Sequence, residues 1–538
     1  MNSAPVWRSR GRETSGQREP GADAAALPAG VLQSIGVVLL RMLQATQTRA
    51  LLLAAVGALL VAILPSGWLS GNEEQYLAEA YRSVAPQDWP QQSNLLGGFP
   101  HAFVFNELFG HLIAAVDFPA AQFIGRMLAI ALYAVGLTRL FAFLRLQVLD
   151  LLIVVTAFVV AGEGLVGDEW MFRGIEPKVL AYGFVLLALT EFLKGRSALC
   201  FGLLLIAVHL HALVGGLWAA IFFAAFMVLG APRRRIVVLH AAVAAVLLVP
   251  YGIFLMRQGY AQFDTFVESA GPPVGWILTY VAYPWHTTPF IDIKSFLKWT
   301  PGLVATLAIG VAAAFAIGRM RDRSAQRLAC LVALSAGWVM IALLLTYVFD
   351  DGRFGPYLLF RPSSMSLLLA LLLLVCALRQ LPAAADPWLR LGMLAVLLLV
   401  FSQTVLHLRV SPVGRELLQQ AEQRELIDWV SSKTRPDSVF LIETGIEHRF
   451  FDFERSTRRA SFFFHRFTPG SSADIREWYR RYLLRERVVA TGCASAKTEL
   501  RIDYLIASAE TADRLAGTCG SATHESGGFR VVEFRRHG

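Results

Sequence analysis

Long apolar stretches recur along the first 408 residues of the chain, and they constrain its fold more than any other feature. Residues 236–256 and 328–348 contain no Asp, Glu, Lys or Arg. Uninterrupted apolar runs of about 18 or more residues are typical of helices that cross a bilayer. Charged residues make up only 17% of the 538 residues, against roughly 25% in soluble domains. We therefore predict a polytopic α-helical membrane protein.

The apolar pattern predicts about eleven transmembrane helices within residues 31–408. A further helix at 31–48 is predicted to lie at the membrane interface. Two long loops separate the spans, at 71–119 and 257–300, and the first of these carries two amphipathic helical patterns at 73–84 and 102–115. The predicted spans are 50–68, 120–144, 148–161, 179–193, 197–211, 215–229, 236–256, 301–317, 327–348, 356–378 and 388–408.

The distribution of basic residues predicts the orientation of these spans. Residues 1–30 are polar and Arg-bearing, and we interpret them as a disordered cytoplasmic tail. With this tail inside, the Arg-rich short loops near 139–145, 194–196, 233–235, 319–323 and 379–390 also fall inside, as the positive-inside rule requires. Both long loops and residues 409–538 then lie outside. This placement explains much of the net charge of +9, so nothing calls for a nucleic-acid partner.

Residues 409–538 are predicted to form a soluble α/β domain. Helical patterns at 416–432 and 472–484 alternate with strand patterns at 438–442, 461–464, 502–507 and 529–534, which favours an open sheet. Cys493 and Cys519 are the two cysteines of this domain, and an oxidising compartment would allow them to form a disulfide. Cys200, Cys330 and Cys376 fall in predicted spans and are interpreted as small core residues.

Acidic residues gather in the segments predicted to lie outside. Glu73 and Glu74 follow the first span directly and are suited to act as a base or to hold a metal ion. The alternative is an ordinary helix start, with Asn72 as its cap and two acids in its first turn. Asp168 and Glu169 lie in a second outside loop and are further catalytic candidates.

Cations at the outer ends of the spans predict an anionic ligand. Pro177 suits the first turn of a helix, which places Glu176 at the N-cap and Lys178 inside that turn, where its charge opposes the helix dipole. A lipid phosphate would relieve this, but Lys178 could also extend to headgroups or pair with Glu176. Arg353 and Arg361 are the other candidate phosphate ligands. A buried Arg361 needs an anionic partner, which is either phosphate or an acid such as Asp350 or Asp351.

Histidine and aromatic residues provide the candidate substrate contacts. His209 and His211 are two positions apart, so they line one site only if the helix breaks there, as Gly215 and Gly216 would permit. The aromatics of 283–289 fit either an interfacial belt or a platform for a sugar. The candidate substrate-binding residues are His101, His209, His211, Trp285 and His286. No strong metal-ligand spacing or nucleotide-binding motif is present.

This arrangement resembles the GT-C superfamily of integral-membrane glycosyltransferases. The shared features are a first span, a long outside loop with an acid pair near its start, many further spans and an outside soluble domain. The segment 425–430, followed by 436–438 and a strand, looks like the exterior domains of bacterial members. The resemblance implies a base or metal-organising acid at Glu73 or Glu74, where the family more often has Asp. It also implies that Lys178, Arg353 and Arg361 hold the phosphate of a polyprenyl-phosphate sugar.

The expected function is therefore transfer of a sugar from a polyprenyl-phosphate donor to a periplasmic glycan, lipid or protein. Its expected location is the bacterial inner membrane, in contact with membrane lipid. No organic cofactor is expected, and whether a divalent metal ion takes part in the reaction stays open. Two alternatives remain, a transporter or flippase for a lipid-linked glycan and a non-catalytic assembly protein. Transporters tend to show internal repeats and charges at mid-membrane depth, whereas this chain has no clear repeat and its charges gather at one face. The Glu-for-Asp difference keeps the non-catalytic alternative open.

Overall fold

The computed structural model of the chain describes residues 29–63, 71–95, 100–167, 169–229, 234–260, 271–349, 352–380, 413–492 and 502–535. It divides into two compact units, residues 1–49 and 50–538. The predicted tail up to residue 28, the predicted span at 388–408, Asp168, Asp350, Asp351 and Cys493 lie outside the described residues. The first helix begins in the first unit, at Ala29, and all later elements belong to the second unit.

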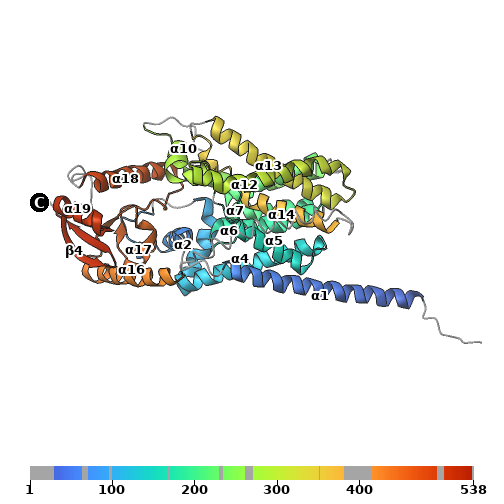
Figure 1. Cartoon of the computed structure of the whole chain (residues 1–538), viewed down its shortest axis with the longest axis horizontal. Helices are drawn as coiled ribbons and strands as arrows, with labels where there is room; N and C mark the ends of the chain where they lie inside the picture. Colours follow the sequence, from blue (N-terminus) through green and yellow to red (C-terminus); the bar gives the residue numbers. More distant parts are fainter. Residues whose placement is uncertain are drawn as a thin grey trace, which may run out of the picture. The chain divides into compact units, whose positions relative to one another are not determined.

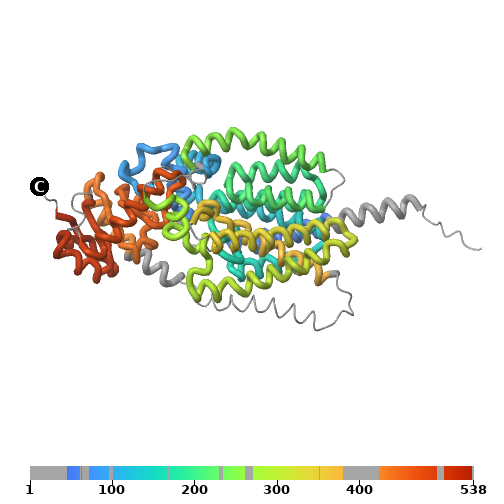
Figure 2. The backbone as a smooth tube through the Cα atoms, turned by 90° about the horizontal axis from the view of Figure 1, so that it is seen from above, coloured from blue at the N-terminus to red at the C-terminus, as the bar shows by residue number. Residues whose placement is uncertain are grey.

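Apolar helices dominate the described part of the chain, in agreement with the predicted helical membrane class. Four of these helices, α4, α9, α12 and α13, are long and apolar enough to cross a membrane, and the other apolar ones are shorter. Eleven spans therefore remain a prediction. The helices of residues 50–380 run roughly side by side (Figures 1 and 2). They are the part of α1 (Ala29–Ile63) from Ala50 onward, α4 (Phe118–Phe143), α5 (Val148–Val160), α6 (Pro177–Leu193), α7 (Ser197–Leu210), α8 (Ala212–Val228), α9 (Arg234–Arg257), α12 (Ile293–Ala316), α13 (Arg323–Val348) and α14 (Ser363–Gln380).

Several helix boundaries differ from the prediction, among them the start of α14 at Ser363 instead of 356 and the end of α18 (Ser472–Thr491) at Thr491 instead of 484. Helix α1 is continuous from Ala29 to Ile63, where the sequence predicted an interfacial helix followed by a separate span. Helix α12 begins at Ile293, whereas the sequence predicted a start at Pro301. Asp292 caps it by accepting a hydrogen bond from the Ser295 amide at 2.6 Å, and an N-cap of this kind stabilises a helix start. Pro301 therefore lies inside a helix that has already begun.

The two long loops contain short helices that build one end of the bundle. The first holds α2 (Gly71–Val84), η1 (Pro86–Asp88), η2 (Pro100–Ala102) and α3 (Phe103–Val116), so both predicted amphipathic helices are confirmed. Helices α2 and α3 cross at Gly110, where an added Cβ would lie 2.3 Å from the Ala80 carbonyl oxygen. The second loop holds α10 (Val274–Ile277), the π-helical turn η4 (Leu278–Ala282) and α11 (Pro284–Thr287), while η5 (Ile317–Arg319) and η6 (Gly355–Tyr357) follow later.

The C-terminal domain is a small mixed sheet with helices, as the sequence predicted. Its strands run in the order β2-β1-β3-β5-β4. The β1 strand pairs in parallel with β2 and β3, whereas β5 pairs antiparallel with β3 and β4. Helix α17, helix α19 and strand β4 were not predicted. The elements are α16 (Val413–Lys433), β1 (Val439–Ile442), η7 (Glu447–Arg449), α17 (Phe453–Thr457), β2 (Ala460–Ser461), α18 (Ser472–Thr491), β3 (Tyr504–Ser508), α19 (Ala509–Cys519), β4 (Gly520–Ser526) and β5 (Phe529–Phe534).

Cysteine pairing follows the prediction where it is described. Cys519 is disulfide-bonded, and Cys200, Cys330 and Cys376 are free. Cys493, its predicted partner, lies outside the described residues.

Polar contacts hold the C-terminal domain against the first long loop. Arg455 of α17 pairs with Glu74 of α2 at 2.9 Å. The buried carboxylate of Glu454 accepts hydrogen bonds from the Trp89 indole at 3.0 Å and from the Asn94 amide at 3.1 Å. Because α2 also lies against the helix bundle, these contacts bring the domain next to the bundle's end.

Candidate functional site

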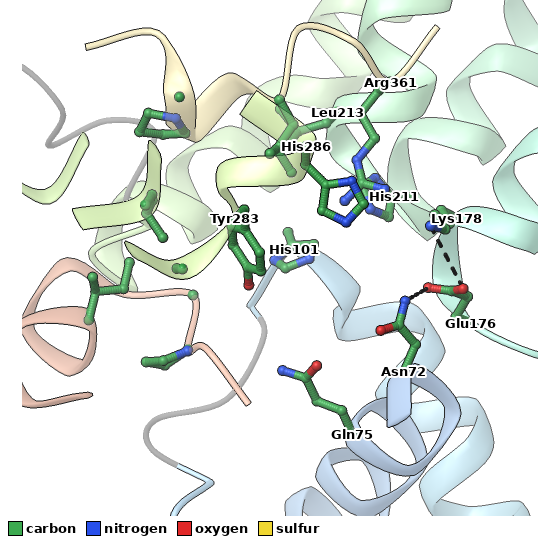
Figure 3. Close-up of a pocket in the computed structure, with 18 of the residues that line it drawn as sticks. Asn72, Gln75, His101, Glu176, Lys178, His211, Leu213, Tyr283, His286 and Arg361 are labelled. Atoms are coloured by element: carbon green, nitrogen blue, oxygen red, sulfur yellow. Dashed lines mark hydrogen bonds and ion pairs between the residues drawn. The ribbon is translucent and has the colours of Figure 1, made fainter. Parts of the chain in front are cut away.

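A cavity lies where the end of the helix bundle meets the C-terminal domain. It contains about 880 Å³ of empty space, including the solvent at its mouth. Figure 3 shows side chains from several elements pointing into this space, among them His101, Glu176, Lys178 and Arg361. The lining also includes Asn72, Gln75, Tyr76, His211, Tyr260, Tyr283, Trp285, His286, Arg466, Pro469, Gly470 and Ile475. Residues distant in sequence are thus brought to one site.

Glu176 is the carboxylate that lines the cavity. It is the N-cap of α6, with Pro177 as the first helical residue, as the sequence predicted. Its oxygens accept hydrogen bonds from the Trp170 indole at 2.6 Å and from the Asn72 side-chain amide at 3.2 Å. Burial raises the pKa of Glu176, and the nearby cations only partly offset this. The result is a buried carboxylate with a higher proton affinity than an ordinary Glu.

Lys178 stands between two carboxylates in the first turn of α6. Its Nζ lies 3.6 Å from Glu169 and 3.8 Å from Glu176. The same nitrogen lies 3.4 Å from the centre of the Trp170 ring, a geometry that favours a cation. Only 2% of Lys178 is exposed, so it pairs within the protein instead of extending to lipid headgroups.

Arg361 forms the second cationic position and is also buried. It donates to Glu169 at 2.8 Å. The sequence predicted either a phosphate or an internal acid such as Asp350 or Asp351 as its partner, and the structure shows that Glu169 is an internal partner. The Nε of Arg361 is buried and makes no hydrogen bond to any described residue. Burial alone would raise the pKa of Glu169, but Arg361, Lys178 and His286 outweigh it and lower that pKa. Glu169 therefore stays ionised behind the two cations.

Arg466 adds a third cation from the C-terminal domain. It lies between β2 and α18, and its Nε donates to the side-chain oxygen of Asn72 at 2.8 Å. Asn72 in turn donates to Glu176, so one amide joins the domain to the cavity's acid (Figure 3). Sequence analysis missed Arg466 because no local pattern separates it from the other surface arginines of a soluble domain.

Three of the predicted histidines line the cavity, and His209 does not. His211 adopts an extended backbone between α7 and α8, so the predicted break exists but falls at His211 itself. The His101 ring lies 5.4 Å from that of His211 and 5.2 Å from that of Tyr260. Burial lowers the pKa of His101 to about 3 and that of His286 to about 4. Both rings are therefore neutral near pH 7. His209 instead bonds the Leu205 carbonyl oxygen within its own helix at 2.9 Å.

Glu73 does not line the cavity, which argues against its predicted role as base. Its carboxylate accepts from Arg126 Nε at 2.9 Å, from Arg126 Nη2 at 2.6 Å, from Gln122 at 3.0 Å and from the Ile175 amide at 2.6 Å. Gly174 makes room for it, since a Cβ there would lie 2.6 Å from the Glu73 carboxyl carbon. The φ of Gly174 is also +69°. Glu73 thus ties α2 to α4 and to the loop before α6.

Glu74 also points away from the cavity, toward Arg455. The reason is helical geometry, because positions three and four apart share one face. Asn72, Gln75 and Tyr76 therefore face the cavity while the two acids between them face elsewhere. Helix α2 begins at Gly71, so Asn72 lies within its first turn and is not the residue before it.

The remaining predicted residues divide between lining and non-lining positions. Trp285 lines the cavity. Arg353 is exposed and absent from the lining, with its guanidinium 5.9 Å from the centre of the Phe349 ring. Among the described residues, no group of three or more His, Cys, Asp or Glu side chains is arranged to hold a metal ion.

The charges around the cavity leave an excess of positive charge. In the described part of the chain, Lys178, Arg361 and Arg466 line it together with one carboxylate, Glu176. Glu169 lies directly behind Arg361 and Lys178. Three cations against two carboxylates leave one positive charge in a largely buried space, which would be relieved by an anion. No protein-family model matches this chain, and no curated protein matches it.

Proposed function

We propose that this protein is a membrane glycosyltransferase that moves a sugar from a polyprenyl-phosphate donor to an acceptor hydroxyl. The observation that carries the proposal is the group of three lining cations, buried Lys178 and Arg361 and half-buried Arg466, beside one carboxylate among the described lining residues, Glu176. The buried Nε of Arg361 has no hydrogen-bond partner among the described residues, and a phosphate oxygen would satisfy this donor. Apolar helices next to the cavity suit a lipid tail. By the positive-inside rule, the proposed location is the outer face of a bacterial inner membrane.

In this proposal Glu176 takes the role of base that the resemblance gave to Glu73 or Glu74. The acceptor oxygen bonds to the anomeric carbon as the bond between that carbon and the phosphate oxygen breaks. The hydroxyl proton passes to Glu176, whose pKa is raised by burial, so it is a stronger base than an ordinary Glu. The bonding electrons leave with the phosphate, and the cations stabilise the charge that develops there. Attack opposite the leaving phosphate would invert the anomeric configuration.

The aromatic side of the cavity suits the sugar itself. Tyr283 and Trp285 line the cavity between the bundle and the C-terminal domain. The Trp285 ring lies 6.0 Å from that of His286, which itself contacts the cationic group through Glu169 at 3.6 Å. A sugar attached to a phosphate at Arg361 would meet these rings, and their apolar faces suit the C–H surface of a pyranose.

A second candidate is a protein that binds a lipid phosphate without transferring a sugar. One observation favours it: both acids at the position where the resemblance predicts the base are held in ion pairs, Glu73 with Arg126 and Glu74 with Arg455. Under this candidate the same cavity would bind polyprenyl phosphate for assembly of a glycan.

The test is turnover by the purified full chain with radiolabelled polyprenyl-phosphate sugars. Glu176→Gln should lower turnover by roughly 10²- to 10⁴-fold, the usual contribution of a general base. Arg361→Gln should raise the donor concentration needed for half-maximal rate. Arg353→Gln is the matched control, because Arg353 is an exposed arginine of the preceding segment that does not line the cavity, and it should leave turnover unchanged.

Three outcomes separate the candidates. Full turnover in Glu176→Gln would remove the assigned base. Stabilisation of the protein by polyprenyl phosphate without sugar release would favour the binding protein. Uptake of the intact donor into sealed vesicles, with no cleavage, would instead indicate a transporter.

A further inference from the structure

Arg466 differs from the other arginines that join the C-terminal domain to the first long loop. Arg455 is neutralised by Glu74 at 2.9 Å. Arg458 donates to the Asp88 carbonyl oxygen at 2.7 Å and is exposed. Arg466 is half-buried, lines the cavity and donates to the neutral amide oxygen of Asn72. An amide satisfies hydrogen bonds but does not neutralise a charge, and Arg466 forms no ion pair with any residue that the structure describes.

The wall that carries Arg466 belongs entirely to the C-terminal domain. Pro469, Gly470 and Ile475 line the cavity beside it. This segment is fixed to the end of α9, where the Ser472 amide donates to the Gly259 carbonyl oxygen at 3.0 Å. The facing wall carries Lys178 and Arg361 on the helix bundle (Figure 3). An anion in the cavity would therefore have cations from both parts of the protein around it.

We propose that Arg466 is an anion-binding residue supplied by the C-terminal domain, so that binding of a lipid-linked phosphate is coupled to docking of this domain on α2. The inference rests on the proposed function only for the identity of the ligand as a polyprenyl phosphate. Beyond the proposed function, we infer that the C-terminal domain supplies part of the binding site and closes the cavity.

The coupling between anion binding and docking of the C-terminal domain follows from charge repulsion and thermodynamic linkage. Without an anion, docking places the positive charge of Arg466 in the wall of the same cavity as Lys178 and Arg361, and like charges repel. A phosphate between the walls replaces this repulsion with attraction to both. A ligand that binds the docked state more tightly must stabilise docking by the same factor. The usual range of such coupling is roughly 5- to 150-fold in affinity.

Hydrogen–deuterium exchange on the full chain in detergent measures docking directly. The peptides to follow are 71–95, on the loop side of the contact, and 459–475, on the domain side. The probe is polyprenyl monophosphate, with the polyprenol of equal chain length and inorganic phosphate as comparison ligands. We expect the lipid phosphate to slow exchange of both segments by about 5-fold or more, as the coupling range implies. The polyprenol should have no effect, and inorganic phosphate should act only at much higher concentration.

Arg466→Gln should abolish this ligand-dependent slowing in 459–475. Arg458→Gln is the matched control, because it removes another arginine of the same contact that does not line the cavity. Either variant could loosen docking in the absence of ligand, so the decisive quantity is the change that the probe produces. Arg458→Gln should keep that change.

The results separate failure of the inference from failure of the proposed function. Slower exchange around 176–178 and 361 with no change in 459–475 would overturn the coupling and leave the lipid-phosphate site standing. An undiminished response in Arg466→Gln would also overturn it. No response at either wall would overturn both the coupling and the proposed donor. Loss of the response in Arg466→Gln alone would support the inference.

Discussion

Replacing Glu73 by Gln distinguishes a structural carboxylate from a catalytic one. Glu73 is fully buried and accepts at least four hydrogen bonds from described residues, of which Arg126 donates two or more. Gln keeps one oxygen acceptor but removes the negative charge, which leaves the Arg126 guanidinium buried without its counter-ion. Removing one partner of a buried ion pair costs about 3–5 kcal/mol. Because Gln retains part of the hydrogen bonding, we expect a loss near 3 kcal/mol.

The assay is chemical denaturation of the purified protein in detergent, with turnover measured on the fraction that remains folded. Arg126→Gln should cost a similar amount, since it leaves the Glu73 charge buried. The double variant Glu73→Gln, Arg126→Met should recover most of the loss, because removing both charges of a buried pair is often close to neutral. Arg139→Gln is the control on the same helix. That residue is 47% exposed, and its buried partner Glu191 keeps Lys194 at 3.2 Å and Arg196 at 3.4 Å, so we expect a loss of about 1 kcal/mol or less.

The structural assignment would be refuted by a Glu73→Gln protein that denatures like the wild type but has lost turnover. In that case the carboxylate would be needed for the reaction and not for the packing of α2 on α4. A Glu73→Gln protein that is less stable, and whose folded fraction keeps wild-type turnover, would instead support the assignment.

Three further predictions concern stability. Burial raises the pKa of Glu74 to about 7, against the opposing effect of its arginine partner, and burial likewise raises that of Glu79 to about 7. Because the pKa of each carboxyl group is higher in the folded than in the unfolded state, its contribution to the unfolding free energy is fully present below about pH 4.5. This contribution is lost as the pH rises through about 7. Glu74→Gln should therefore reduce the fall in unfolding free energy across this pH range. The double variant Glu74→Gln, Glu79→Gln should remove most of that fall. An unchanged dependence of the unfolding free energy on pH would contradict the assignment. Reduction of the disulfide at Cys519 should destabilise the C-terminal domain by about 2–5 kcal/mol in denaturation followed by near-ultraviolet circular dichroism, and full resistance of the domain to reductant would be the contrary result. Gly174→Ala should destabilise the protein by at least about 1–3 kcal/mol, since it combines a positive φ with a contact to Glu73; wild-type denaturation would show that the loop adjusts freely.

Much of the architecture could be predicted because it depends on local patterns. Apolar runs predicted helices close to their observed bounds, such as α4 and α5. The Glu176–Pro177 pair correctly predicted the start of α6, because a proline at the first helical position is a local signal. The predicted start of α12 was wrong because two local signals compete there, and the cap at Asp292 prevails over Pro301. The number of spans is not decided by length, since several of the helices are shorter than a bilayer requires.

The site was predicted only in part because it depends on contacts between distant segments. Lys178 and Arg361 stood out as cations in apolar surroundings, and both line the cavity. The face of α2 could have been deduced from the spacing of Asn72, Gln75 and Tyr76, whereas the prediction rested on the acids between them. Arg466 carried no such signal, because its place at the cavity depends on the contact of the C-terminal domain with the distant Asn72.

The position of Arg466 in the chain matters for biosynthesis. It is translated after the segments that carry Lys178 and Arg361, so under the proposed function a nascent chain would reach the membrane with its anion site open on one side. During that interval water can enter among Lys178, Arg361 and their carboxylate partners. Under the proposed coupling, tight capture of the ligand would begin only after the ribosome has completed the last wall, which would keep a lipid-linked phosphate from binding to an unfinished protein.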